Sequence, residues 1–162
     1  MGFGDIGIID SSSQRSILGC SGVLDLKGFS HFGPGARIEI GSNAILSLGN
    51  NVANSGGCTI ECQKSITIGS DTIISWESLI MDTDFHRVQN LIDKSISDPQ
   101  KSIVIGDNCW IGVRTLILKG TIIKKNTIIG AGSLVNKKFD KENILIAGNP
   151  ANMIKQDVLP VH

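Results

Sequence analysis

The strongest pattern in the chain is an aliphatic residue that recurs every six positions. The series runs through Ile105, Ile111, Ile117, Ile123, Ile129 and Val135. A small residue follows four positions after each of the first five, at Cys109, Thr115, Thr121, Thr127 and Ser133. An amphipathic helix would instead place apolar residues three and four positions apart. The six-residue period predicts short strands joined by turns, with the aliphatic and the small residue both directed inward.

A second tract upstream has the same character. Its inward positions are Leu48, Asn54, Ile60, Ile68, Ile74 and Ile80. One step in this series is longer than the others, which indicates a wider corner. Coils built in this way bury their apolar face only against neighbouring coils, as in other solenoids. We therefore expect an all-β fold, a parallel β-helix of about five to seven coils.

The pattern also predicts the organisation of the chain. Residues 1–162 should form a single domain, since domains commonly contain ~100–200 residues. Residues 1–30 fit the repeat poorly and are expected to form an irregular start. An insertion at about 81–102 interrupts the repeat, and residues 136–162 should form a C-terminal extension with a short helix or tail. A long polar loop in a tight solenoid is usually functional.

Charge and composition exclude several classes of function. Lys and Arg together number 15, as do Asp and Glu, so the chain lacks the basic excess expected for nucleic-acid binding. No apolar run approaches the ~20 residues that span a bilayer, so we expect no transmembrane segment. The start lacks the pattern of a signal peptide. We expect a cytoplasmic protein with reduced thiols and no metal, because Cys58 and Cys62 lack zinc-site spacing.

Several motifs together resemble the hexapeptide-repeat acyltransferases: the hexads, the loop sequence MDTDFH, and the segments IGDNCWIG, IGAGS and AGNPA. The resemblance covers about Ile38 to Lys155. It implies a left-handed parallel β-helix and a homotrimer with acetyl-CoA sites between subunits. The loop is most similar to that of polysaccharide-biosynthesis O-acetyltransferases related to the maltose and galactoside acetyltransferases. This implies transfer of an acetyl group from acetyl-CoA to a sugar hydroxyl.

The resemblance also implies roles for residues of the inserted loop. His86 would be the general base that takes the proton from the acceptor hydroxyl during direct transfer. An imidazole suits this task because its unperturbed pKa is ~6.5; otherwise His86 is a solvated loop residue. Asp84 is the favoured partner that would orient His86, and Asp82 would hold a sugar hydroxyl, unless both cap the loop. Trp76 would either pack on a pyranose ring or cover the loop.

The donor side of the site is implied by the downstream coils. Val113 and Ala131 match positions whose backbone amides hold coenzyme A in the family. Asn136 and Lys137 match the stretch near the pantetheine and the phosphates. Lys155 is the candidate for a further phosphate contact, because a lysine can neutralise a phosphate as a point charge.

Other functions stay open at this stage. The first alternative is N-acetylation of an amino sugar or nucleotide sugar. A non-catalytic β-helix is a second alternative. A carbonic anhydrase of the γ class is a third, but it needs three histidines around one zinc ion. His31 and His162 lie far from His86 in the repeat.

Overall fold

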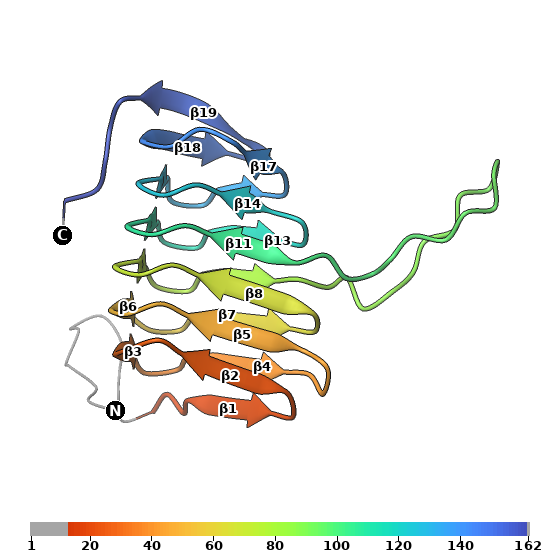
Figure 1. Ribbon diagram of the computed structural model, residues 1–162, viewed down its shortest axis with the longest axis horizontal. Coiled ribbons are helices and arrows are strands. Elements are labelled where there is room, and N and C mark those ends of the chain that lie inside the picture. Colours follow the sequence, from red (N-terminus) through yellow and green to blue (C-terminus); the bar gives the residue numbers. More distant parts are fainter. Residues whose placement is uncertain (1–12, 162) are drawn as a thin grey trace.

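A computed structural model describes residues 13–161 of the chain and shows a three-sided prism of stacked coils (Figure 1). The described residues form 19 strands and no helix. Successive strands turn from one side of the prism to the next, and each side is a sheet of parallel strands from successive coils. The fold is thus an all-β parallel β-helix of six coils, consistent with the left-handed form that the resemblance implies.

We name the three sides faces A, B and C in chain order. Face A contains β1 (Ile17–Cys20), β4 (Arg37–Ile40), β7 (Thr59–Cys62), β10 (Leu79–Met81), β13 (Leu116–Leu118) and β16 (Leu134–Val135). Face B contains β2 (Val23–Leu26), β5 (Ile45–Leu48), β8 (Ser65–Ile68), β11 (Ile103–Ile105), β14 (Ile122–Ile123) and β17 (Lys138–Phe139). Face C contains β3 (Ser30–Phe32), β6 (Val52–Asn54), β9 (Ile73–Ile74), β12 (Trp110–Ile111), β15 (Ile128–Ile129), β18 (Ile144–Gly148) and β19 (Ala151–Gln156).

The hexad positions form the core, as the sequence predicts. The six aliphatic residues from Ile105 to Val135 are all buried, and so are the five small residues four positions later. The small polar residues close the corners. The hydroxyls of Thr115, Thr121 and Thr127 each donate a 2.7 Å hydrogen bond to the carbonyl three residues earlier. This satisfies a buried backbone acceptor and explains why threonine recurs there.

The two ends of the chain differ from the sequence prediction. Residues 1–12 of the expected irregular start at 1–30 lie outside the described residues. From Ile17 onward, strands β1, β2 and β3 form a regular first coil that pairs with β4, β5 and β6. At the other end the sequence predicts a short helix or tail, and the helix is wrong: residues 151–156 form the strand β19, which pairs antiparallel with β18. The edge of face C needs a backbone partner, and β19 supplies it.

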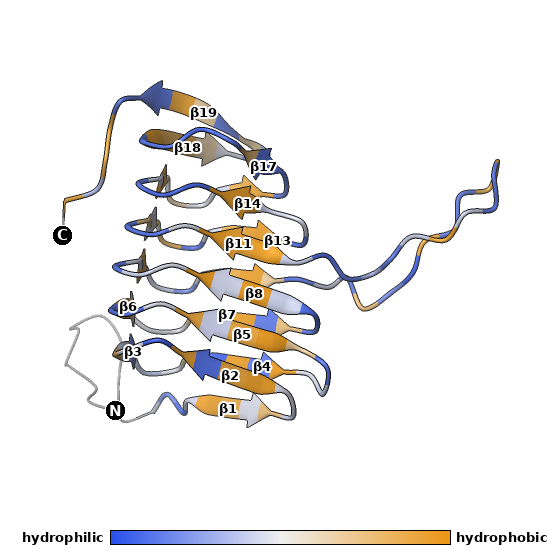
Figure 2. Ribbon diagram, in the orientation of Figure 1, coloured by the Kyte–Doolittle hydropathy of each residue, from blue (hydrophilic) through white to orange (hydrophobic). Residues whose placement is uncertain are grey.

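The insertion forms a narrow ribbon that projects from the corner between faces A and B (Figure 1). It leaves after β10 and returns at β11. Antiparallel bridges join its two arms at Thr83 with Gln100 and at Gln89 with Ile96. Its apolar residues are exposed on this projecting ribbon (Figure 2), and they include Val88, Leu91, Ile92 and Ile96.

Three of the four cysteines should be unreactive in the folded protein. Burial raises the pKa of Cys58 and Cys62 to about 12 and that of Cys109 to about 11, whereas Cys20 is exposed. The thiolate is the reactive form of cysteine, and an ordinary thiol has a pKa of about 8.5. We therefore expect only Cys20 to react quickly with a thiol reagent near about pH 8. All four should react after unfolding. Rapid reaction of a second thiol in the native protein would contradict the burial of these side chains.

Candidate active site

His86 lies on a tight turn in the outgoing arm of the loop. Its backbone N–H donates to the carbonyl of Asp84 at 2.7 Å, and Phe85 between them has φ of 60°. This is the pattern of a classic γ-turn, which is rare and strained. A left-handed conformation at a bulky residue costs about 1–3 kcal/mol and persists only where the surroundings hold it. The imidazole itself is exposed.

Side chains at the base of the loop hold this turn. Thr83 is buried, and its hydroxyl accepts a hydrogen bond from the Phe85 N–H at 2.9 Å. The Asp84 N–H donates to the Pro99 carbonyl on the returning arm at 2.9 Å. The carboxylate of Asp84 forms an ion pair with Lys119 Nζ at 2.6 Å. Asp84 therefore contacts His86 through its backbone, while its charge is directed to Lys119.

Asp82 is placed differently from the expectation for a sugar ligand. Its side chain is fully buried below the loop. Its carboxylate oxygens accept hydrogen bonds of 2.7–2.8 Å from the backbone N–H groups of Gln63, Lys64 and Ser65. A carboxylate engaged in this way closes the corner of the coil below. The assignment of Asp82 as a substrate-binding residue is therefore withdrawn.

A second group of predicted site residues lies at the corner between faces C and A. Trp76, Val113 and Ala131 follow β9, β12 and β15. Backbone hydrogen bonds stack these corners, since the Arg114 N–H donates to the Trp76 carbonyl and the Gly132 N–H donates to the Val113 carbonyl. Trp76 thus lies before β10 in the chain, whereas the loop lies after β10. Trp76 therefore lies at a different corner from His86 of the same chain, because the strand β10 separates them.

The indole of Trp76 has an unused donor. Its Nε1–H is buried and has no hydrogen-bond partner among the residues that the structure describes. By contrast, the indole N–H of Trp110 donates to the Ser75 hydroxyl at 3.2 Å. Buried polar groups are normally paired, so the Trp76 indole is a candidate contact for a molecule that binds at this corner.

The remaining donor-side candidates lie near the loop corner and the C-terminal end. Asn136 lines a cleft of about 420 Å³ beside the loop, together with Lys101, Ser102, Lys119, Gly120, Ile122 and Lys138. Lys137 donates to the Asn152 side chain at 2.7 Å and lies over the ring of Phe139. Lys155 is exposed on β19. Three lysines line this cleft. Because Lys119 is paired with Asp84, Lys101 and Lys138 supply the positive charge that suits an anionic group.

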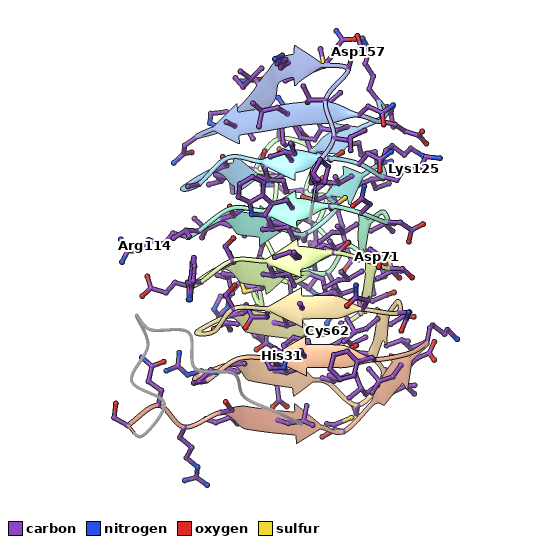
Figure 3. All side chains as sticks on the ribbon, turned by 90° about the vertical axis from the view of Figure 1, so that its left-hand side faces the viewer. His31, Cys62, Asp71, Arg114, Lys125 and Asp157 are labelled. Atoms are coloured by element: carbon purple, nitrogen blue, oxygen red, sulfur yellow. The ribbon has the colours of Figure 1, made fainter. Side chains whose placement is uncertain are left out.

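The predicted site residues therefore divide between two corners of the prism. His86, Asp84 and Asn136 belong to the corner between faces A and B, whereas Trp76 and the two backbone positions belong to the corner between faces C and A. Figure 3 shows Arg114, from the second corner, projecting at the opposite edge of the prism from Lys125. One chain does not bring the two groups together.

Comparison with known proteins places the chain in a family. The protein family described as "Bacterial transferase hexapeptide (six repeats)" matches residues 102–137. The chain is 30% identical over 138 residues to a protein of Escherichia coli K12 named "Putative lipopolysaccharide biosynthesis O-acetyl transferase WbbJ", covering 76% of this chain and 67% of that protein. The chain belongs to the hexapeptide-repeat acyltransferases.

Two further relatives of this acyltransferase are close in sequence or fold. The galactoside O-acetyltransferase of Escherichia coli K12 is 31% identical over 123 residues, covering 76% of this chain but 59% of its own length. A galactoside acetyltransferase solved in complex with coenzyme A superimposes with a TM-score of 0.61 at 24% identity, over 83% of this chain and 64% of that one. The acyltransferase thus spans roughly two thirds or less of the length of these three relatives.

Three further observations on the acyltransferase concern metal ligands, the second described histidine and membrane-spanning helices. Between residues 13 and 161, no group of three or more His, Cys, Asp or Glu side chains could hold a metal ion. His31 lies in β3, in the first coil, near the lower end of the prism in Figure 3. In the same described part of the chain, no helix is long and apolar enough to cross a membrane.

Lys119 is a residue at the loop for which sequence reasoning gave only the role of a further basic candidate for the donor phosphates, and not its contact with the loop. It follows β13, and Leu118 at the end of β13 pairs with Met81 at the start of the loop. Stepping through the hexads would have placed residue 119 directly over the loop entrance, so the signal was present in the repeat.

Proposed function

We propose that this acyltransferase is an acetyl-CoA-dependent O-acetyltransferase that acts on a sugar hydroxyl in cell-surface polysaccharide biosynthesis. The observation that carries the proposal is His86, an exposed imidazole on a strained turn at the base of the loop. Family membership and the similarity to lipopolysaccharide and galactoside acetyltransferases support the substrate class. The four unpaired thiols suit a reducing, cytoplasmic setting.

The proposed reaction is a direct transfer. His86 accepts the proton of the acceptor hydroxyl as its oxygen attacks the thioester carbonyl carbon. A C–O bond forms, the C–S bond breaks, and the departing thiolate takes the proton from the imidazolium. No covalent enzyme intermediate is needed, because the thioester is already activated. Asp84 contributes by holding the turn through its backbone carbonyl.

The donor would lie along the column of Val113 and Ala131. Their corners are fixed by coil-to-coil backbone hydrogen bonds, so they present a rigid row of backbone groups. A galactoside acetyltransferase of the same fold has been solved with coenzyme A, which supports this use of the fold. Asn136, Lys137 and Lys155 are the proposed polar and basic contacts for the pantetheine and phosphates.

Assembly as a homotrimer would complete the site. The His86 corner and the Val113 corner of one chain lie apart, so a neighbouring copy must supply one of them. The loop also exposes apolar side chains far from its own prism: Ile92 is 93% exposed and Leu91 is 78% exposed. Burial of such residues against a neighbour would stabilise association.

This arrangement predicts a trimer in solution. Sedimentation equilibrium at micromolar concentration should give the mass of three chains. The variant Leu91→Asp with Ile92→Asp should dissociate and lose acetyl transfer, because each site would lack its second chain. A wild-type protein that sediments as an active monomer would contradict the shared site.

The proposed activity is tested by a panel of acceptors. Release of coenzyme A from acetyl-CoA should be measured with simple sugars, oligosaccharides, nucleotide sugars and amino sugars. We expect at least one carbohydrate hydroxyl acceptor to raise the rate well above background hydrolysis. Binding of acetyl-CoA with no acceleration by any carbohydrate would contradict the proposal, and acceleration by amino sugars alone would favour N-acetylation.

A further inference from the structure

Lys119 lies directly over the point where the loop leaves the prism. It follows β13, whose last residue, Leu118, is in register with Met81 at the end of β10. The residue after β13 is thereby brought above the loop entrance. The side chain of Lys119 is only 18% exposed, which is unusual for a lysine. Its ammonium group must therefore have partners close by.

The ammonium group of Lys119 contacts both arms of the loop. On the outgoing arm it pairs with the Asp84 carboxylate at 2.6 Å. On the returning arm it donates to the Asp98 carbonyl at 3.1 Å. The contact with Asp84 is a charge-assisted hydrogen bond in a partly desolvated position, where such bonds are stronger than at an open surface.

Asp84 connects Lys119 to the turn that carries His86. Its carboxylate binds Lys119, and its carbonyl accepts the backbone N–H of His86 at 2.7 Å across the strained Phe85. We infer that Lys119 is a positioning residue that acts through Asp84 to hold the turn presenting His86. This inference rests on the proposed function for its kinetic consequence, but the restraint on the turn does not depend on it.

A second lysine at the same loop base provides a matched comparison. Lys64 binds the Asp98 carboxylate at 3.3 Å and donates to the Gln100 carbonyl at 3.5 Å. Both partners belong to the returning arm, and Lys64 is 47% exposed. The side chain of Lys64 therefore fastens the loop without contacting the arm that carries His86. The contact of Lys64 with Asp82 uses the backbone N–H, which a methionine at this position keeps. Substituting each lysine by methionine separates general attachment of the loop from control of the His86 turn.

The kinetic experiment compares four variants with the wild type: Lys119→Met, Lys119→Arg, Asp84→Asn and Lys64→Met. Misplacement of a catalytic group by about 1 Å can reduce a rate about 100-fold. We expect Lys119→Met and Asp84→Asn each to lower kcat about 10- to 100-fold with little change in acetyl-CoA affinity. Lys119→Arg should restore most of the rate, and Lys64→Met should remain near wild type.

The double variant tests whether the two residues act as one unit. Combining Lys119→Met with Asp84→Asn should be no worse than either change alone, since each already breaks the pair. Lys119 also lines the basic cleft, so a direct phosphate contact is the competing role. A loss of acetyl-CoA affinity with unchanged kcat, or multiplicative losses in the double variant, would overturn the inference.

An activity-independent measurement uses the small number of histidines. The chain has three, so histidine-selective isotope labelling gives three backbone amide signals, and His86→Ala identifies the one from His86. This signal should shift and broaden in Lys119→Met but not in Lys64→Met. An unchanged signal would refute the role of Lys119. If the wild type transfers no acetyl group, the proposed function fails while this measurement still decides whether Lys119 holds the turn.

Discussion

Replacing His86 with alanine should lower kcat by about 100- to 10,000-fold, the usual contribution of general-base assistance. The variant removes the proposed proton acceptor but leaves the loop base unchanged, because the contacts of Thr83 and Asp84 use the backbone of the turn. Acetyl-CoA affinity, measured by calorimetry, should change little. Val113 and Ala131, the proposed donor contacts, lie at the other corner.

A matched control is available in the other described histidine. His31 lies in the first coil, and His31→Ala should leave kcat within about twofold, as is usual away from a site. If His86→Ala keeps near-normal turnover on a confirmed acceptor, the loop histidine is structural. The assignment of the base would then be withdrawn, even with the fold and donor binding intact.

Replacing Asp82 with alanine should lower the free energy of unfolding by about 3 kcal/mol or more. The buried carboxylate accepts three backbone hydrogen bonds from Gln63, Lys64 and Ser65. Removing it leaves these donors without their partner, at a cost of about 1–3 kcal/mol for each group kept from water. Denaturant unfolding measures the effect.

Asp84 gives the control for this prediction. It lies two residues away, but its carboxylate is 51% exposed and forms a single ion pair. Asp84→Ala should lower the unfolding free energy by about 1 kcal/mol, less than Asp82→Ala, because solvent screens the half-exposed Asp84 carboxylate and it has one ion-pair partner instead of three backbone donors. The two alanine variants should thus differ in their main effect: Asp82→Ala should lower stability, and Asp84→Ala should lower turnover. Equal losses of stability would contradict the distinct environments described for them.

The core of the fold could be predicted from the sequence because one repeated step fixes it. Each hexad position from Ile105 to Val135 is buried as expected. The first coil carried the same signal: Leu18, Leu26, Phe32 and Ile38 repeat the steps of eight, six and six found between Ile60 and Ile80. The apolar pattern is weaker in this coil because glycine and serine flank these residues.

Contacts that depend on stacking were harder to predict. The segment from Ala151 to Gln156 has no apolar alternation, and its strand depends on the open edge of β18. The burial of Asp82 depends on three N–H groups from the coil below, which no local pattern reveals. Trp76 and His86 are only ten residues apart in the sequence, but the intervening strand β10 places them at different corners of the prism.

The most direct test of the proposed activity is the fate of the acetyl group. Acetyl-CoA labelled in the acetyl group should be incubated with the acyltransferase and the carbohydrate panel, and the products analysed by mass spectrometry. We predict one labelled acetyl group on a sugar oxygen, released by mild base as expected for an ester, and absent when His86→Ala replaces the wild type. Label found only in free acetate, or only on nitrogen, would contradict sugar O-acetylation.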